Sequence, residues 1–312
     1  MPALNSPPPP AYAIDARAAR RNADRAAPGY AAAARLEQEI GLRMLERLDY
    51  VKLAPRRILD AGCGPSPQAA QLTARYPEAQ LLALDFSLPM LRAGRPPGGL
   101  SGGLPGWLGR LYRRLTRAPA PVPLCADFAR IPLAARSCSL LWSNMSLHWA
   151  SDPAAAIAEF HRVLDLDGLL MFSTLGPDTL RQLRAAFAPA QAAAHVHAFI
   201  DMHDLGDMLV AAGFAAPVMD AETLTLTYPG VEGLFADLRG SGQACALASR
   251  ARGLMGARKW RSVRSALQSG MREARLPVTI EVVYGHAWKG APRRTPEGHA
   301  VVKLTGRGGR QR

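Results

Sequence analysis

The 312-residue sequence lacks any run of about eighteen apolar residues, so none of it is expected to span a membrane. Its beginning has no apolar segment followed by a cleavage site, and we expect a cytoplasmic protein. Cysteines are few and scattered, without the spacing of metal ligands or of a redox pair: Cys63, Cys125, Cys138 and Cys245. No metal site is therefore expected. Cys63 lies in a glycine loop, where we interpret it as a small residue packed under a ligand rather than as a nucleophile.

Acidic residues are also few: 25 Asp and Glu stand against 38 Lys and Arg, which gives a formal net charge of +13. The excess of positive charge is concentrated in a few segments. Residues 92–117 contain six Arg and no acidic residue, and residues 250–275 contain seven Arg and one Lys against a single Glu. The segment 289–312 is basic as well, whereas the remainder of the chain is acidic. This distribution predicts an acidic partner. A nucleic acid is disfavoured, because the basic segments contain few aromatic residues on which bases could stack.

Apolar runs alternate with helical patterns along the first part of the chain. Strands are expected at 57–60, 81–85, 122–126, 139–143 and 169–173, with helices at 67–76, 88–93 and 153–164. Further on, helices are expected at 178–189, 203–212, 231–239 and 244–274, and strands at 218–228 and 278–288. The first five apolar runs are too continuous for half-exposed strands, whereas 218–228 alternates. The pattern predicts an α/β fold with a doubly wound, mostly parallel, seven-stranded Rossmann-like sheet.

The same pattern divides the chain into one folded domain with two tails. We expect a flexible N-terminal tail at 1–28, a domain at 29–290 and a basic C-terminal tail at 291–312. A Gly-, Pro- and Arg-rich basic insertion occupies 94–121, and a helical lid with the substrate-side elements is assigned to 178–215 and 230–275.

The segment "ILDAGCGPSP" that follows the first strand lacks the parts of a phosphate site. It contains Asp60, Gly62 and Gly64, but the third glycine of a dinucleotide loop is missing and two prolines remove N–H donors. No P-loop lysine follows, which excludes a nucleoside triphosphate. A tight loop that opens with an acid suits a ligand with an ammonium group and no phosphate, and S-adenosylmethionine has both properties.

Polar residues follow the next three strands where each one ends. Asp85 is placed to accept hydrogen bonds from both ribose hydroxyls, and Phe86 beside it is assigned to the same site. Asp127 can accept the adenine amino proton, and Phe128 can lie against the ring. Asn144 lies over the point where the strand order reverses. Capping or a turn explains any one of these acids, but explains three acids at three consecutive strand ends poorly.

At these residues the sequence resembles the class I S-adenosylmethionine-dependent methyltransferases. The motifs "LDAGCG", "LALDFS", "ADFARIPL", "LWSNMSLHW" and "VLDLDGLLMFSTL" carry the resemblance over about residues 29–175. A sharper resemblance, to the malonyl-acyl-carrier-protein O-methyltransferases of biotin synthesis, includes "FSTLGPDTLRQLRAAF", "HVHAFIDMHDLGDMLVAAGF" and "TYPGVEGLFADLRGSG". The late motifs are also similar to those of methyltransferase-fold assembly factors of respiratory complex I, described as arginine hydroxylases.

The sharper resemblance implies an acidic acyl-carrier protein as partner, with the free carboxylate of its malonyl thioester as methyl acceptor. That carboxylate is already ionised at neutral pH, so no general base is required. The residues proposed to hold it or to close the site are Tyr30, His148, Arg184, His195 and Arg239. Alternatives are methylation of another small acid, of a quinone precursor or of RNA, and an assembly factor or protein-arginine hydroxylase that retains the cofactor pocket.

Overall fold

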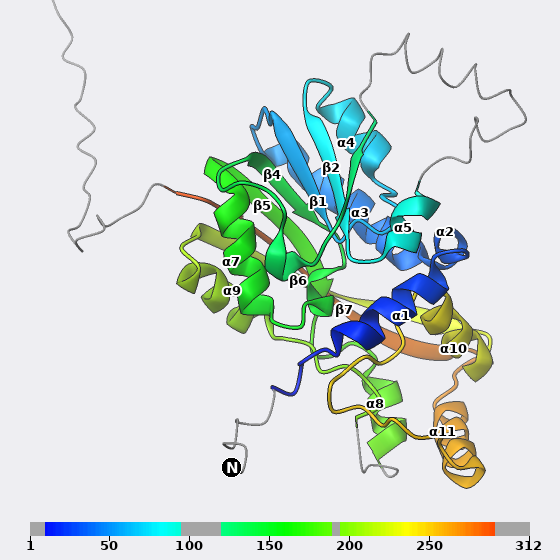
Figure 1. The fold of residues 1–312 in the computed structure, drawn as a ribbon. Helices are drawn as coiled ribbons and strands as arrows, with labels where there is room; N and C mark the ends of the chain where they lie inside the picture. Colours follow the sequence, from blue (N-terminus) through cyan, green and yellow to red (C-terminus); the bar gives the residue numbers. More distant parts are fainter. Residues whose placement is uncertain (1–9, 95–119, 189–193, 291–312) are drawn as a thin grey trace, which may run out of the picture.

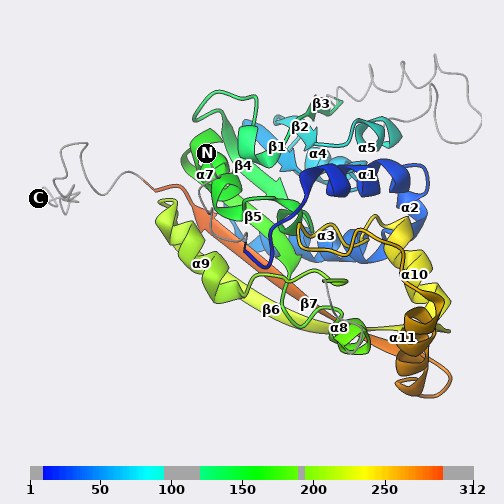
Figure 2. The same cartoon turned by 60° about the horizontal axis from the view of Figure 1, so that its bottom comes forward.

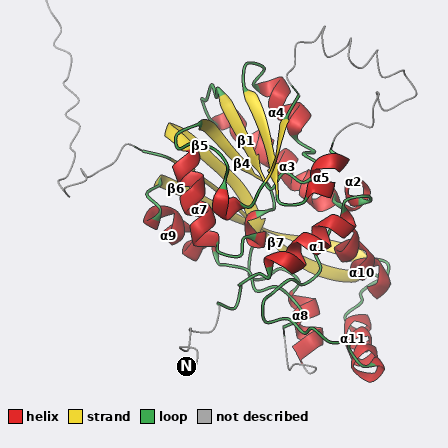
Figure 3. Ribbon diagram, in the orientation of Figure 1, coloured by secondary structure: helices red, strands yellow, loops and turns green. Residues whose placement is uncertain are grey.

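A seven-stranded sheet with the order β3-β2-β1-β4-β5-β7-β6 organises the computed structural model, which describes residues 10–94, 120–188 and 194–290 (Figures 1 and 3). The strands are β1 (Arg57–Ala61), β2 (Gln80–Asp85), β3 (Val122–Cys125), β4 (Cys138–Ser143), β5 (Leu164–Leu175), β6 (Ala215–Tyr228) and β7 (Leu276–Trp288). The first five pair in parallel, and β7 runs antiparallel to both β5 and β6. The predicted mostly parallel sheet is confirmed.

Successive residues of the central strands pack into different cores, as the continuous apolar runs predicted. On β4, Leu140 and Trp142 join the core beneath α3 (Arg35–Arg47) and α4 (Ala69–Arg75), whereas Leu141 joins the core beneath α7 (Pro153–Val163) and α9 (Met202–Ala211). All three side chains are fully buried. Because both faces of these strands are covered, the ligand-accessible part of the sheet is the edge formed by the strand ends.

The remaining helices lie around the carboxyl ends of the parallel strands (Figure 1). They are α1 (Ala16–Ala26), α2 (Tyr30–Ala33), α5 (Leu88–Ala93), α8 (Arg181–Phe187), α10 (Val231–Gly240) and α11 (Ala257–Ser269). Figure 2 shows the long β6–β7 ribbon continuing past the other strands toward α8, α10 and α11. This ribbon gives the C-terminal helices a support beside the strand ends.

The predicted flexible tail is wrong for residues 16–26, which form α1. Asp15 caps this helix by accepting hydrogen bonds from the backbone N–H groups of Arg17 and Ala18, and it forms an ion pair with Arg250 at 2.9 Å. Small alanines on one face allow close packing while the arginines stay outside. Residues 1–9 lie outside the described part of the chain.

The single helix predicted at 244–274 is also wrong, because only Ala257–Ser269 is helical. The segment before it is non-helical, turns at residues 248–249 and is bound to the N-terminal region: Asp15 N donates to Ala246 O, and Ala248 N donates to Ala13 O, both at 2.8 Å. The predicted insertion and the C-terminal tail fall mostly or wholly outside the described residues. No helix in the described ranges is long and apolar enough to cross a membrane.

Candidate active site

The glycine loop after β1 turns sharply beneath the end of β2. Gly62 and Gly64 have φ angles of +74° and +53°, in the left-handed region that glycine adopts readily. The N–H groups of Gly62 and Cys63 donate to Leu84 O at 2.8 and 2.9 Å. A Cβ atom on Gly62 would lie 2.4 Å from the Cβ of Ser146, so no side chain fits there. The loop therefore brings bare backbone to the cavity above it.

Asp85 lies at the end of β2 with both carboxylate oxygens held by backbone. Gly64 N donates to Oδ2 at 2.9 Å and Ser87 N donates to Oδ1 at 2.7 Å. Burial raises the pKa of Asp85 to about 6, and these two N–H donors counteract the rise. Each oxygen retains acceptor capacity for a further donor. A fixed carboxylate of this kind suits a pair of ribose hydroxyls.

Asp60 occupies a different place from the one expected. It is buried beneath the glycine loop, where it accepts a hydrogen bond from Ser66 Oγ at 2.7 Å, and burial raises its pKa to about 7. It does not line the cavity that Asp85 lines. Asp127 caps the short 3-10 helix Phe128–Arg130 by accepting from Ala129 N at 2.9 Å, and it lines a small neighbouring pocket. Whether these two acids contact the ligand stays a prediction.

The cavity above the loop is narrow and walled by aromatic side chains. Six of the eight residues predicted to bind the cofactor line it: Gly62, Gly64, Asp85, Phe86, Phe128 and Asn144. Its wall also includes Tyr30, Trp149, Met145, Ser146, Ser241, Gly242 and Gln243. None of its described lining residues is Lys or Arg. An acidic, aromatic cavity without cationic side chains fits a sulfonium nucleoside and disfavours a phosphate.

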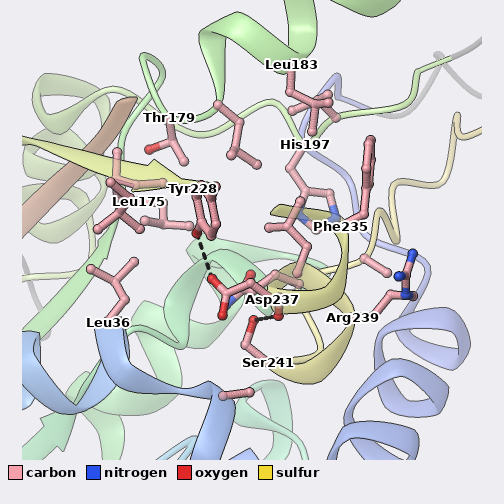
Figure 4. Close-up of a pocket in the computed structure, with 18 of the residues that line it drawn as sticks. Leu36, Leu175, Thr179, Leu183, His197, Tyr228, Phe235, Asp237, Arg239 and Ser241 are labelled. Carbon is pink, nitrogen blue, oxygen red and sulfur yellow. Dashed lines mark hydrogen bonds between the residues drawn. The ribbon is translucent and has the colours of Figure 1, made fainter. Parts of the chain in front are cut away.

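A second cavity, of about 610 Å³, lies between α3, α8, α10 and the end of β6. Most of its wall is apolar and includes Leu36, Leu175, Leu183 and Phe235 (Figure 4). Its polar groups are largely paired with one another. In Figure 4, Asp237 Oδ2 accepts from Tyr228 Oη at 2.7 Å and Asp237 O accepts from Ser241 Oγ at 2.9 Å. The cavity therefore suits a largely apolar ligand.

The two cavities adjoin each other. Three residues line both cavities: Met145, Ser241 and Gln243. Tyr30 lines only the narrow cavity above the glycine loop. A group transferred between ligands of the two cavities must pass this junction. None of the three was singled out from the sequence: Met145 and Ser241 lie in the motifs "LWSNMSLHW" and "TYPGVEGLFADLRGSG", but nothing in these motifs marks a residue that faces two cavities, and Gln243 follows the second motif.

The predicted acceptor-binding residues are not all brought to this junction. His195 stacks on Phe187 with ring centroids 4.6 Å apart and, together with Arg184, also lines a small neighbouring pocket. His195 and Arg239 line the larger of the two adjoining cavities and not the narrower one. Arg184 lies outside the larger cavity, because its guanidinium donates to the carbonyl oxygens of Pro177, Thr179 and His197 at 3.0 to 3.2 Å. The guanidinium of Arg184 therefore holds the chain around α8 together, and its role in binding the acceptor carboxylate stays a prediction.

His148 is another residue whose predicted role in holding the acceptor stays a prediction. It lines neither cavity, and burial lowers its pKa to about 3. The neighbouring His197, which accepts a hydrogen bond from Ala246 N at 2.8 Å, has its pKa lowered to about 4 for the same reason. Both rings are neutral at physiological pH and cannot attract a carboxylate by charge. His148 fits an aromatic packing role, with ring centroids 5.3 Å from Trp149 and 5.8 Å from Phe199.

Comparisons with known proteins agree with this architecture. A family profile described as a methyltransferase domain matches residues 59–172. A putative methyltransferase from Bacillus halodurans superposes with a TM-score of 0.53 at 15% identity, covering 80% of this chain and 99% of that one. The putative methyltransferase of Haloferax volcanii, solved with the Trm112 activator, gives a TM-score of 0.51 at 15% identity over 88% of this chain and 99% of that one. These structures establish the likeness of fold.

Sequence relatives are much closer. The malonyl-[acyl-carrier protein] O-methyltransferase of Laribacter hongkongensis is 50% identical over 297 residues, which cover 94% of this chain and 97% of the relative. The protein of the same name from Gallionella capsiferriformans is 46% identical over 294 residues, which cover 94% and 98% of the two chains.

The strand order, the glycine loop and the matched domain are those of a class I S-adenosylmethionine-dependent methyltransferase, which confirms the predicted class and cofactor. The near full-length relatives extend this assignment: the chain belongs to the malonyl-[acyl-carrier protein] O-methyltransferase family. Asp85, Phe86, Phe128 and the backbone of Gly62 and Gly64 would hold the cofactor in the narrow cavity.

Proposed function

We propose that the protein transfers a methyl group from S-adenosylmethionine to the free carboxylate of a malonyl thioester carried on acyl-carrier protein, an early step of biotin synthesis. The observation that carries the proposal is the 610 Å³ apolar cavity that adjoins the cofactor cavity at Met145, Ser241 and Gln243. Such a cavity suits the acyl end of a thioester, with the malonyl carboxylate at the junction. The names of the relatives favour the same acceptor.

The reaction requires alignment more than acid–base catalysis. When bound, S-adenosylmethionine supplies an electrophilic methyl group on a sulfonium centre. A malonyl carboxylate is ionised at neutral pH, so the protein need not remove a proton from it. The neutral His148 and His197 agree with this, because neither is adjusted to titrate near pH 7. The contribution of the chain is to hold the carboxylate about 3 Å from the methyl carbon and to exclude water.

The mouth of the large cavity suits an acidic carrier. Arg35, Arg239 and Arg275 line the cavity and are exposed. The basic helix α11 packs beside it, with the ring of Trp260 4.9 Å from that of Phe235 in the cavity wall. Acyl-carrier protein as an acidic partner explains this concentration of positive charge better than a nucleic acid does, because the exposed face of α11 offers few aromatic rings.

The proposed function is tested by methyl transfer from labelled S-adenosylmethionine to purified malonyl-acyl-carrier protein. We expect label in an alkali-labile methyl ester on the carrier. Acetyl-acyl-carrier protein is the matched control, because it has the same thioester and lacks only the carboxylate; it should remain unlabelled. Absence of label from the malonyl carrier would contradict the proposal, and label on another small acid, a quinone precursor or RNA would identify the alternative acceptor.

The charge on α11 leads to a second expected result. Replacing Arg258, Lys259 and Arg261 with Glu should raise the KM for malonyl-acyl-carrier protein about tenfold at low salt, since each exposed pair contributes up to about 1 kcal/mol. The salt dependence of KM should become flatter, whereas kcat and the affinity for the cofactor should hardly change. All three side chains are exposed, so folding should be preserved.

A matched charge change on the opposite edge of the sheet serves as the control. Lys52, Arg56 and Arg136 are exposed near the amino ends of the parallel strands, and their replacement with Glu changes the net charge equally. Docking on α11 predicts little effect of this control on KM. Similar increases in both triple variants would indicate a general electrostatic effect and refute docking at α11.

A further inference from the structure

A chain of hydrogen bonds crosses the junction between the two cavities. Gln243 Nε2 donates to Glu37 Oε1 at 3.2 Å, and the backbone oxygen of Glu37 accepts from Asn144 Nδ2 at 2.7 Å. Ser173 Oγ donates to Asn144 Oδ1 at 2.9 Å, and accepts from Met145 N at 2.9 Å. Four segments far apart in the sequence are thus fixed relative to one another at the place where the ligands would meet.

The backbone at Met145 indicates that this junction is held in a defined shape. Met145 has a φ of +50°, a left-handed conformation that is uncommon for a residue other than glycine. Its N–H donates to the buried Ser173 Oγ, which holds the turn in place. Unfavourable backbone conformations of this kind persist where the surrounding contacts fix them, and they are frequent at functional sites.

Of the three residues that line both cavities, Gln243 alone retains a side-chain donor for an acceptor there. Met145 has no donor in its side chain. The single hydroxyl hydrogen of Ser241 is used in the bond to Asp237 O. The amide nitrogen of Gln243 carries two hydrogens, of which the contact with Glu37 uses one.

We propose that the Gln243 amide positions the acceptor carboxylate beside the methyl donor, and that Glu37 orients this amide from behind. The inference rests on the proposed function, because it requires a carboxylate at the junction. A neutral donor suits the reaction, since a guanidinium would stabilise the carboxylate charge and weaken it as a nucleophile. The arginines agree with this arrangement: Arg239 lines only the large cavity and Arg184 is bonded to backbone carbonyls.

The test measures kcat, KM for malonyl-acyl-carrier protein and the dissociation constant of S-adenosylhomocysteine. Gln243→Ala should lower kcat/KM about 10- to 150-fold, the effect expected for loss of one hydrogen bond to a charged group. Gln243→Glu should lower it further, because it places an ionisable carboxyl opposite the acceptor. Cofactor affinity should change less than threefold in both.

Gln80→Ala is the matched control, because Gln80 Oε1 accepts a hydrogen bond from Arg57 Nε at 3.1 Å at the start of β2 and Gln80 lines neither cavity. Its kinetics should equal those of the parent. A parent that methylates the malonyl carrier, together with a Gln243→Ala variant of unchanged kcat/KM, would overturn this inference and leave the proposed function intact. A parent that leaves the malonyl carrier unmethylated would refute both.

The charge of Glu37 provides a second measurement, the pH dependence of KM. This dependence is expected only if the Glu37–Gln243 pair faces the acceptor, and not if Gln243 has a purely structural role. Burial raises the pKa of Glu37 to about 7, with a smaller increase from Asp237 and a decrease from the bond to Gln243. Further titratable groups near this pair are the phenols of Tyr30 and Tyr228, which Glu37 affects, and the buried His148, whose pKa the Gln243 side chain affects. Below pH 7 the protonated Glu37 is neutral, whereas above it the ionised form repels the acceptor carboxylate.

KM for malonyl-acyl-carrier protein should therefore rise several-fold between pH 6 and 8 in the parent. Glu37→Gln retains an oxygen that can accept from Gln243 but cannot ionise, so it should remove this rise while retaining activity at pH 6. A Glu37→Gln variant whose KM rises with pH as steeply as that of the parent would show that the group at position 37 does not face the acceptor.

Discussion

Asp85→Ala is expected to lower the affinity for S-adenosylmethionine and S-adenosylhomocysteine by about 100-fold or more. The carboxylate lines the cofactor cavity and is held by Gly64 N and Ser87 N, which leaves an acceptor site on each oxygen for a ribose hydroxyl. Charge-assisted hydrogen bonds contribute roughly 1.5–3 kcal/mol each, and two of them are lost. The dissociation constant is measured by calorimetry, and NAD binding should be undetectable in the parent and the variant.

Two further variants separate a ligand contact from a folding defect. Asp201→Ala removes an aspartate that also accepts backbone N–H, from His203 at 2.8 Å, but at the start of α9 away from the cavity. It should bind the cofactor like the parent. Asp85→Asn retains one oxygen of similar geometry and should give an intermediate affinity. If Asp85→Ala bound the cofactor as tightly as the parent while remaining folded, the assignment of Asp85 to the ribose would be wrong.

Sequence reasoning was most successful where a local pattern determines position. Gly62, Gly64 and Asp85 follow buried parallel strands, and the carboxyl ends of such strands meet at one edge of the sheet. Their place in the cofactor cavity was therefore predictable without coordinates. Asp60 has the same local pattern, yet it lies under the loop, where Ser66 Oγ donates a hydrogen bond to it. The sequence pattern does not specify which of the two acids faces the ligand.

The acceptor side of the site was much less predictable, because it is built from distant segments. Glu37 and Gln243 form a hydrogen bond although 206 residues separate them. The surroundings of Arg184 were unpredictable for the same reason: its charge suggested a carboxylate ligand, and the fold places three carbonyl oxygens around it. The N-terminal segment was mistaken for a tail because its packing partner, at 244–250, is not visible in the local sequence.

The N-terminal helices bear on how the cofactor enters. Asn22 Nδ2 donates to Ala244 O at 2.8 Å, and Asp24 Oδ1 accepts from Ser87 Oγ at 2.6 Å, so α1 bridges the segment after α10 and the start of α5. The cavity below has a volume of about 60 Å³, whereas sites for ligands of this class occupy about 300–1,000 Å³. We propose that α1, α2 and the stretch after β5 act as a lid that opens for the cofactor and closes for reaction.

Tyr30 is the residue of this lid whose replacement should have the largest effect. Its ring lies over the glycine loop, with Cε1 3.8 Å from where a Cβ on Gly64 would be. Burial, with smaller effects from Glu37 and Asp85, raises the pKa of its hydroxyl well above the usual range, so the hydroxyl is protonated and can only donate or accept a neutral hydrogen bond. Tyr30 thus provides an aromatic cover and one donor.

Two substitutions distinguish the cover from the donor. Tyr30→Phe retains the ring and loses only a hydrogen bond, worth about 0.5–1.5 kcal/mol, so turnover should fall about 3- to 10-fold. Tyr30→Ala opens the site to water as well, and the rate should fall at least about tenfold further. Water that enters the site hydrates the charged acceptor carboxylate and disturbs its alignment with the methyl group. Turnover is measured at saturating cofactor and carrier protein, so that weaker binding does not contribute. Parental turnover in Tyr30→Ala under these conditions would mean that the N-terminal helices are no lid and that another segment closes the site.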